Sequence, residues 1–414
     1  FPYTTLFRSA SSRAAIQNDI VALMAELDNI AATTSYNGMG LLNGSFTNKQ
    51  FQIGAYSNQV VNVSIGNTIS DVIGSVRTET SAEIASAGVA GILSNGVAMS
   101  FYTPSGVAVN IGSVVMSQSA GTGLGALVNQ INKASDQTGV TASYNVQFTG
   151  SAGVAAVSTT GNIVINNVTI GAVTNVLTND SDGKLVNAIN AASLQTGVTA
   201  SIDVGGRLTL TSNDGRGIMF GGLSGAVVAT ANEFSGSTAV TTFGRMTLRM
   251  QGANDIIVSS TNSVLGGAIM SGSTSYTSNL KSIASNYTVS QAIAMGAYAS
   301  ITQENQALSG GANLGVGVTT RVGAMLAMDI AESAIKQLDK IRASLGSAQN
   351  QVIATVNNIS VTQVNVAAAE SQIRDVDFAF ESSNFSKRNI LAQSGSYALS
   401  QANQLQQNVL RLLQ

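Results

Sequence analysis

The sequence contains no histidine and no cysteine among its 414 residues. It therefore lacks the residue types on which Ser-His-Asp and Cys-His catalysis, zinc sites, haem ligation and disulfide bonds depend. Only 10% of the residues are charged and the formal net charge is −2, which offers little to neutralise a phosphate backbone. These absences close off most catalytic repertoires, and we expect no cofactor, no metal site and no nucleic-acid partner.

Proline and long apolar runs are also scarce. Proline occurs only at positions 2 and 104, so the chain beyond position 104 carries no helix-breaking imide and very long helices are permitted there. No run approaches the ~18 apolar residues that a bilayer span requires, and we expect no membrane partner. Hydrophobic residues nevertheless make up 44% of the chain, which is enough for the cores of two or three domains.

The first nine residues, FPYTTLFRS, differ in character from the rest of the chain. They back-translate in frame to a common sequencing-adapter sequence, and the chain begins with Phe rather than Met. We interpret residues 1–9 as an artefact, with the biological chain starting near Ala10 after a missing upstream segment of unknown length. The alternative is a genuine extended N-terminus.

The segment from Ser11 to Thr34 predicts an amphipathic helix. Two Asn-Gly pairs come next in YNGMGLLNGSF, and FQIG and VVNVSIG then alternate apolar and polar residues, as half-buried strands in hairpins do. Residues 10–80 are therefore one helix that leads into a small sheet. The apolar residues of the helix recur in steps of four and three and fall on one stripe: Ile16, Ile20, Leu23, Leu27 and Ile30.

Residues 81–318 predict a β-rich region, because Gly, Ser, Thr and Val dominate and short strand-like runs recur. Within it, LVNQINKASDQTGVTAS (127–143) and LVNAINAASLQTGVTAS (185–201) differ at only three of 17 positions. The two repeat units lie near 107–150 and 165–217. Each copy predicts a helix, a stop at a glycine (Gly139 or Gly197) and a strand.

The last hundred residues predict two long helices. An apolar seam recurs in steps of three and four over six heptads, as in a coiled coil. A helix unbroken from Val322 to Ile373 would be a rod roughly 80 Å long at ~1.5 Å per residue. The seam residues of this helix, which we group with the stripe on 11–34 as the rod seam, are Leu338, Ile341, Leu345, Val352, Ile359, Val366 and Ile373.

A second amphipathic helix lies beyond the charged and aromatic segment from Asp375 to Glu381. An apolar stripe so near a chain end must fold back, fray or be buried against another molecule, and we favour the third option. The residues of this terminal stripe are Leu391, Ala398, Ala402, Leu405, Val409 and Leu412.

Two motif-like stretches favour structural roles. SAGTGLGAL places Gly121, Gly123 and Ala126 in the G-x-G-x-x-A spacing of a dinucleotide-binding turn, but no acidic residue occurs about twenty positions later to hold a ribose. NDSDG (179–183) resembles the start of a calcium loop but lacks ligands at Thr178 and Ile189. We expect a loop before a helix in both places.

The C-terminal stretches AAAESQIRDVDFA, NILAQSGSYALSQANQ and NVLRLLQ resemble the C-terminal region of bacterial flagellin, the filament subunit. The stretch AIQNDIVALMAELDNIAATTSYNGMGLLNGSF resembles the second half of the N-terminal conserved region of that family, and the LVNxINxASxQTGVTAS repeats resemble a motif of its variable outer domains. FTNKQFQIGAYSNQ is most similar in wording to flagellins of the Campylobacter and Helicobacter group.

The resemblance implies an α+β fold in which long α-helical, coiled-coil-like ends flank a β-rich variable insert. Residues 10–80 would be the N-terminal half of the rod domain, 81–318 the outer domains, 319–374 the C-terminal rod helix and 375–414 the filament-core helix. The sequence departs from the family at its front, where the long N-terminal helix of flagellins is absent. That helix pairs with the terminal helix in the family, so polymerisation by this fragment is in doubt.

The resemblance also implies function, partners and location. It implies a non-catalytic subunit that polymerises with itself into the flagellar filament for swimming. Other implied partners are hook-associated and cap proteins and an export chaperone at the C-terminal helix. The implied location is extracellular, reached by the flagellar type III route without a cleaved signal peptide.

Two alternatives belong to other classes. A secreted adhesin or immune-facing binding protein would use the β-rich middle as its active part and the helices as a stalk. A zinc-protease insert, which some flagellins carry, needs an H-E-x-x-H motif that a chain without histidine does not have.

Overall fold

The computed structural model describes residues 10–53, 59–84, 96–103, 105–156, 162–221, 240–260, 273–298, 301–309 and 315–413. The chain divides by its contacts into two compact units. The first runs up to Thr47 and from Ser64 to Ser344, and the second runs from Asn48 to Val63 and from Leu345 onward. The expected artefact at 1–9 lies outside the described residues.

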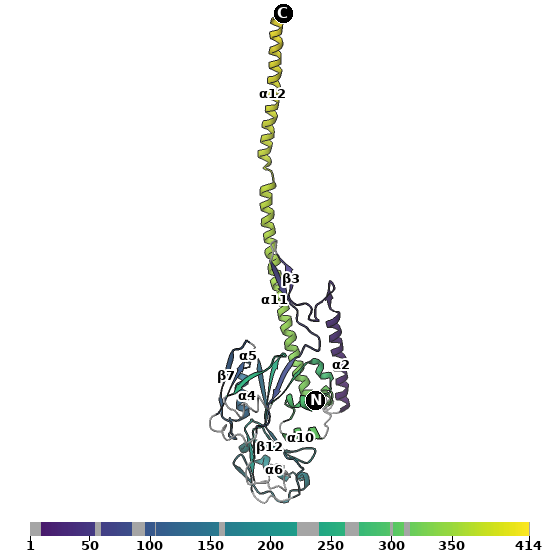
Figure 1. Cartoon of the computed structure of the whole chain (residues 1–414), viewed down its shortest axis with the longest axis vertical. Coiled ribbons are helices and arrows are strands. Elements are labelled where there is room, and N and C mark those ends of the chain that lie inside the picture. The colour runs from purple at the N-terminus through teal and green to yellow at the C-terminus, as the bar shows by residue number, and fades with distance from the viewer. Residues whose placement is uncertain are drawn as a thin grey trace. The chain divides into compact units, whose positions relative to one another are not determined.

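The fold is α+β, as expected, with long helices toward both described ends and antiparallel sheets between them (Figure 1). The helices are α2 (Ala10–Thr33), α4 (Leu124–Lys133), α5 (Ser135–Thr138), α6 (Lys184–Ala191), α7 (Ser193–Thr196), α9 (Val289–Ala294), α10 (Ile301–Ser309), α11 (Arg321–Arg374) and α12 (Phe378–Leu412). Short 3-10 turns lie at η2 (Thr178–Asp180), η4 (Leu280–Ala284) and η5 (Gly317–Thr319).

The described strands form antiparallel sheets with the orders β18-β5-β16-β8, β11-β10-β14-β15, β12-β13-β9 and β17-β6-β7, and the hairpins β1-β2 and β3-β4. Their bounds are β1 (Ser35–Tyr36), β2 (Met39–Gly40), β3 (Lys49–Gln52), β4 (Val60–Val63), β5 (Val76–Thr80), β6 (Val97–Tyr102), β7 (Ala108–Val114), β8 (Val140–Asn145), β9 (Gln147–Thr149), β10 (Ile163–Ile165), β11 (Val168–Gly171), β12 (Val198–Ile202), β13 (Leu208–Ser212), β14 (Ile218–Gly221), β15 (Val240–Thr242), β16 (Arg245–Gln251), β17 (Ile257–Ser260) and β18 (Thr274–Ser278).

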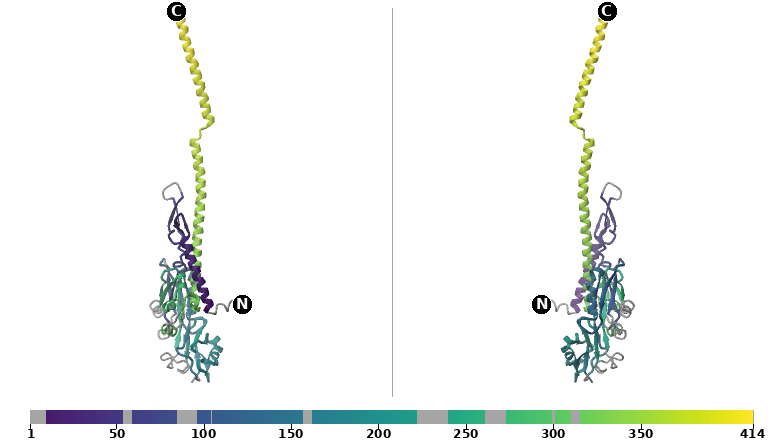
Figure 2. Two further views of the ribbon diagram at one scale, coloured as in Figure 1. Left: turned by 90° about the vertical axis from the view of Figure 1, so that its right-hand side faces the viewer. Right: turned by 90° about the vertical axis from the view of Figure 1, so that its left-hand side faces the viewer.

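The helix expected at 11–34 is α2, and it lies beside the first turns of α11 in Figures 1 and 2. Met24 of α2 shares a small core with Ile283, Ala327 and Ile330. A buried amide strengthens this junction: Gln17 donates to the carbonyl of Ile283 at 2.9 Å and accepts from the N–H of Val318 at 2.9 Å. Chain segments far apart in the sequence therefore meet at one side of α2.

The expected hairpins are present. The Asn-Gly pair at 37–38 forms the turn between β1 and β2, with left-handed φ values of 50° and 78°. The segments FQIG and VVNVSIG supply β3 and β4, which pair from Lys49↔Val63 to Gln52↔Val60. Strand β5, which the sequence groups with these N-terminal elements, pairs instead with β16 and β18 of the β-rich region.

The repeat units fold as predicted, with one addition. Each helix is interrupted before its end, so that α4 and α5 meet at Ala134 and α6 and α7 meet at Ala192. The glycine stops have left-handed φ values of 71° at Gly139 and 72° at Gly197, and a strand begins at the next residue of each copy. The first segment of each helix, α4 or α6, buries its Leu and Ile residues in the main core, whereas Leu194 of α7 is exposed.

The predicted C-terminal rod helix is the 54-residue α11, which runs without a break. It ends in the charged segment that separates it from α12. Asp377 has an extended backbone, and its carboxylate accepts from the N–H groups of Ala379 and Phe380, so it caps the N-terminus of α12. The break therefore needs no proline, because a strong capping residue starts a new helix there.

Candidate assembly surfaces

No residue of α12 is buried. Of the terminal stripe, Leu391 is 61% exposed, Leu405 59%, Val409 53% and Leu412 87%, and Ala398 and Ala402 are also exposed. At 100° per residue these six positions fall within a sector of about 80°. The described fold thus leaves a continuous apolar strip of α12 open to solvent.

Further exposed apolar side chains surround this strip, and a search for one heptad stripe does not find them. Leu399 and Leu410 lie roughly 110° around the helix axis from the stripe, and Ile390 and Tyr397 lie about 90° away on its other side. A helix that is apolar on several sides is ordinarily buried. An angular plot of all the apolar residues would have revealed these flanks from the sequence.

The rod seam on α11 becomes more exposed toward the C-terminus of that helix. Leu338 and Leu345 are near the limit between half-buried and exposed, whereas Val366 is 60% exposed and Ile373 85%. Ile341 and Val352 are half-buried, and Ile359 is exposed. In the first turns of α11 the described buried positions include Gly323, Leu326, Ala327, Ile330, Ser333 and Ala334.

The stripe on α2 is divided between two faces. Ile16, Ile20 and Leu27 are half-buried, but Leu23 is 70% exposed and Ile30 46% exposed. The buried positions are Gln17, Met24 and Ala31, spaced seven apart. The inward face of α2 is therefore rotated from the predicted stripe, because Gln17 is held inside by two hydrogen bonds that a search for apolar residues does not detect.

Two of the three glycines of SAGTGLGAL, Gly123 and Gly125, pack against backbone. A Cβ on Gly123 would lie 2.5 Å from the carbonyl oxygen of Gly215, and one on Gly125 would lie 2.2 Å from the carbonyl oxygen of Asp214. The N–H of Gly125 donates to the Gly215 carbonyl at 3.2 Å. Gly123 and Gly125 thus allow the close contact between the first repeat helix and the loop after β13.

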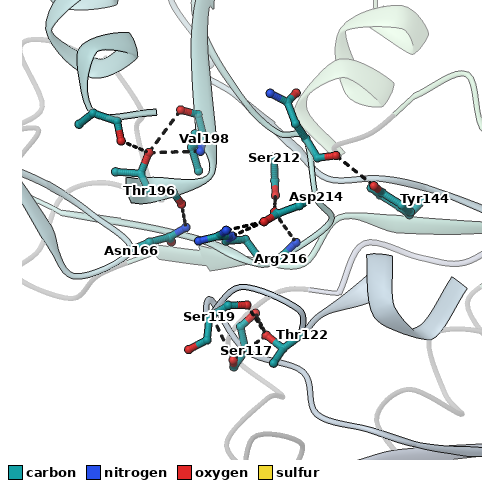
Figure 3. Close-up of polar contacts among 12 residues, drawn as sticks. Ser117, Ser119, Thr122, Tyr144, Asn166, Thr196, Val198, Ser212, Asp214 and Arg216 are labelled. Carbon is teal, nitrogen blue, oxygen red and sulfur yellow. Dashed lines mark hydrogen bonds and ion pairs between the residues drawn. The ribbon is translucent and has the colours of Figure 1, made fainter. Parts of the chain in front are cut away.

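That loop is held by its own ion pair (Figure 3). Arg216 donates through Nε to Asp214 at 2.7 Å, and the hydroxyl of Tyr144 in the first repeat donates to the carbonyl of Asn213 at 3.1 Å. Burial by itself raises the pKa of Asp214, but the hydrogen bonds and the positive charge of Arg216 outweigh it and hold that pKa below its ordinary value. The two repeat units are therefore joined through polar and backbone contacts.

The NDSDG stretch is a loop before a helix, as predicted. The carboxylate of Asp180 accepts from the N–H groups of Leu185 and Val186 at 3.0 and 2.9 Å, so it caps the start of α6. Within the described part of the chain, no group of three or more acidic side chains is arranged to hold a metal ion.

A groove of about 410 Å³ lies between the first turns of α11 and the sheet that contains β16 and β8. Its charged lining is largely paired: Arg249 contacts Asp329 at 3.0 Å, and Lys336 contacts Glu332 at 2.6 Å. Burial raises the pKa of Asp329, although the charge of Arg249 opposes the shift. Because these charges already neutralise one another, we interpret the groove as a polar contact region between the sheet and the helix.

Among the helices of the described residues, none combines the length and the apolarity needed to cross a bilayer.

Three family models match the chain. The "Bacterial flagellin C-terminal helical region" matches residues 328–413, and the "Bacterial flagellin N-terminal helical region" matches 5–47. The "Flagellin hook IN motif" matches twice, at 103–160 and 162–214, and so includes both copies of the repeated motif, 127–143 and 185–201.

Curated relatives match over nearly the whole chain. Flagellin B of Helicobacter pylori (strain ATCC 700392 / 26695) is 50% identical over 420 residues, covering 98% of this chain and 80% of the relative. Flagellin A of Helicobacter mustelae is 45% identical, with coverages of 93% and 80%. B-type flagellin of Pseudomonas aeruginosa is 30% identical, with coverages of 98% and 78%. A solved structure of FliC from Burkholderia pseudomallei is 16% identical with a TM-score of 0.26, over 83% of this chain and 86% of that one.

Proposed function

The chain belongs to the bacterial flagellin family, and we propose that it assembles through the apolar helix faces that its own fold leaves uncovered. Members of this family are structural subunits that polymerise into the extracellular flagellar filament, and the chain is not an enzyme. Its wording is closest to the Helicobacter group, in keeping with identities of 45–50% to those flagellins.

The observation that carries the proposal is that no residue of α12 is buried. Large apolar side chains such as Leu405 and Leu412 lie open on a well-formed helix. Burying one leucine side chain contributes about 1.5–3 kcal/mol, so a helix with this many exposed apolar residues gains much by packing against others. The rod seam on α11 and the exposed residues Leu23 and Ile30 of α2 would extend the same packing along the subunit.

The proposal extends to proteins that bind the subunit before and during assembly. An exposed apolar helix in a free subunit is an aggregation hazard, so an export chaperone that covers α12 would keep the subunit soluble until it leaves the cell by the flagellar type III route. Hook-associated and cap proteins would bind at the two ends of the polymer, where α12 faces no neighbouring flagellin.

The adhesin alternative is not favoured. The family models match both helical ends as well as both repeat units, whereas a stalk would require no flagellin-like terminal helix.

Co-sedimentation of the full-length protein, followed by electron microscopy of the pellet, tests the proposal. We expect ordered filaments above a critical concentration. A persistently soluble monomer at high concentration, with α12 protected from proteolysis, would show that the helix is covered within its own chain.

A further inference from the structure

Strands β8 and β12, which end the two repeat units, each lie at the edge of a sheet. Strand β8 pairs only with β16, and β12 pairs only with β13, among the described residues. An edge strand presents unpaired N–H and C=O groups, to which a strand from another molecule can add. At two outward residues of each edge, however, side chains of the same repeat occupy these groups.

Alternation along the strand identifies those groups. Successive residues of a strand direct their N–H and C=O groups to opposite sides. The carbonyl and N–H of Ala142 and of Ala200 bond to helix side chains, so these residues face away from the partner strand. Val140 and Val198, two positions earlier, face the same outer edge.

An asparagine covers the alanine in each copy. The N–H of Ala142 donates to Oδ1 of Asn132 at 2.7 Å, and Nδ2 of Asn132 donates to the carbonyl of Ala142 at 3.0 Å. In the second copy, Asn190 makes the same pair of bonds with Ala200, also at 2.7 and 3.0 Å. A carboxamide carries one acceptor and donors in one plane, so it pairs with the edge as the peptide group of a neighbouring strand would.

A threonine covers the valine in each copy. The N–H of Val198 donates to Oγ1 of Thr196 at 3.2 Å (Figure 3). The single hydrogen of that hydroxyl faces two acceptors, the carbonyl of Ala192 at 3.1 Å and the carbonyl of Val198 at 3.4 Å. In the first copy, Thr138 accepts from the N–H of Val140 at 3.2 Å, and its hydroxyl lies 3.1 Å from the carbonyl of Ala134 and 3.5 Å from that of Val140. Each repeat therefore pairs both outward backbone groups of its edge-strand alanine and the outward N–H of the valine two residues earlier.

We propose that Asn132 and Thr138, and their equivalents Asn190 and Thr196, form an edge lock that prevents β8 and β12 from pairing with the same strands of a second copy. Identical edges are self-complementary, because an antiparallel pair related by a two-fold axis brings the same groups of both copies together. A homopolymer brings many identical edge strands close together. If these edges are closed, subunits can associate only through their helices.

Two internal comparisons support the assignment to these residues. The copies differ at three positions of the repeat, yet both keep the asparagine and the threonine with matching distances. Asn129 and Asn187 lie three residues earlier on the same helices and are exposed, and neither side chain makes a hydrogen bond with the described part of the chain. An asparagine on the repeat helix is therefore not sufficient to bond to the strand edge. Only the asparagine whose position faces that edge makes these hydrogen bonds.

The test compares Asn132→Ala/Asn190→Ala with the matched control Asn129→Ala/Asn187→Ala in the full chain. We expect the amide protons of Ala142 and Ala200 to exchange about tenfold faster in the first variant only. We also expect that variant alone to form sedimenting assemblies that bind the β-sheet dye thioflavin T, while helical filament formation is retained. Gln17→Leu, which weakens a distant junction, controls for loss of stability alone.

A variant that stays folded, exchanges the two amides faster and yet forms no more dye-binding assembly than the control would overturn the proposal. So would equal dye binding by Gln17→Leu at matched stability. If the asparagine variant does not fold, the near-isosteric Thr138→Val/Thr196→Val exposes the edge at the valines with little change of volume. Dye-binding assembly by that folded variant supports the lock, and its absence overturns it.

Discussion

Replacing Leu405 and Leu412 with aspartate tests the assembly role of the terminal stripe most directly. Both leucines lie on the stripe, seven residues apart, and both are exposed in the subunit, at 59% and 87%. Exposed substitutions away from packed features change the free energy of unfolding by about 0.5 kcal/mol or less. The folded subunit should therefore tolerate the double change.

The effect on the polymer is much larger. The exposed parts of the two side chains together amount to about one and a half leucines, so their burial contributes roughly 2–4 kcal/mol per subunit. Since 1.4 kcal/mol corresponds to a factor of ten, losing this contribution raises the critical concentration for assembly roughly thirty- to thousand-fold. Burial of two unpaired carboxylates would raise it further. We expect no filaments at concentrations at which the unchanged full-length protein polymerises.

The assay is sedimentation of the full-length protein over a concentration series, with circular dichroism to confirm that the subunit is folded. The matched control is Ser400→Asp/Gln407→Asp, which introduces the same charges with the same spacing on the opposite side of α12. Filaments of normal critical concentration from the leucine variant would refute the role of the stripe. Equal loss of assembly in both variants would show that added charge, and not the apolar face, is responsible.

Single contacts lead to three further predictions. Gln17→Leu should lower the free energy of unfolding by about 1–3 kcal/mol in a urea titration, because two backbone groups that the amide satisfies are left buried without partners. Gly125→Ala should destabilise the β-rich region more than Gly121→Ala. A Cβ on Gly125 would lie 2.2 Å from backbone, whereas a Cβ on Gly121 would meet nothing within 4 Å and would add only the strain of its φ of 77°. Comparison of the thermal unfolding midpoints of the two variants checks this. The lowered pKa of Asp214 means that its pairing with Arg216 stabilises the fold above the unfolded pKa and is lost as the pH falls through the lower folded pKa. Asp214→Asn should therefore flatten the acid limb of the stability profile, and an unchanged limb would contradict the assignment.

The position of the buried face of α2 illustrates what sequence periodicity misses. Apolar spacing predicted the helix correctly and placed Leu23 and Ile30, which are exposed, on one stripe, but it gave no sign that Gln17 is buried. A buried glutamine is stable only where its amide meets backbone partners, and those partners lie 266 and 301 residues away in the chain. Long-range contacts of this kind leave no local periodic signal.

In the repeat units, too, some features could be predicted from the sequence and others could not. The helix, the glycine stop and the strand could be predicted from spacing and from the φ that glycine permits. The short break at Ala134 and Ala192, and the pairing of Asn132 and Asn190 with the strand edge, could not. Asparagines 129 and 132 are equivalent as residue types, and only the folded position of the strand distinguishes them.

The amino-acid sequence by itself determined the chain of helices, turns and strands, the exclusion of histidine and cysteine chemistry, and the flagellin-like ends, because these depend on residue type and on spacing along one segment. The tertiary structure alone decided which apolar residues remain uncovered, which glycines touch backbone and which polar side chains close a sheet edge. Those properties depend on which distant segments pack together, and burial is a property of the packed chain and not of any stretch within it.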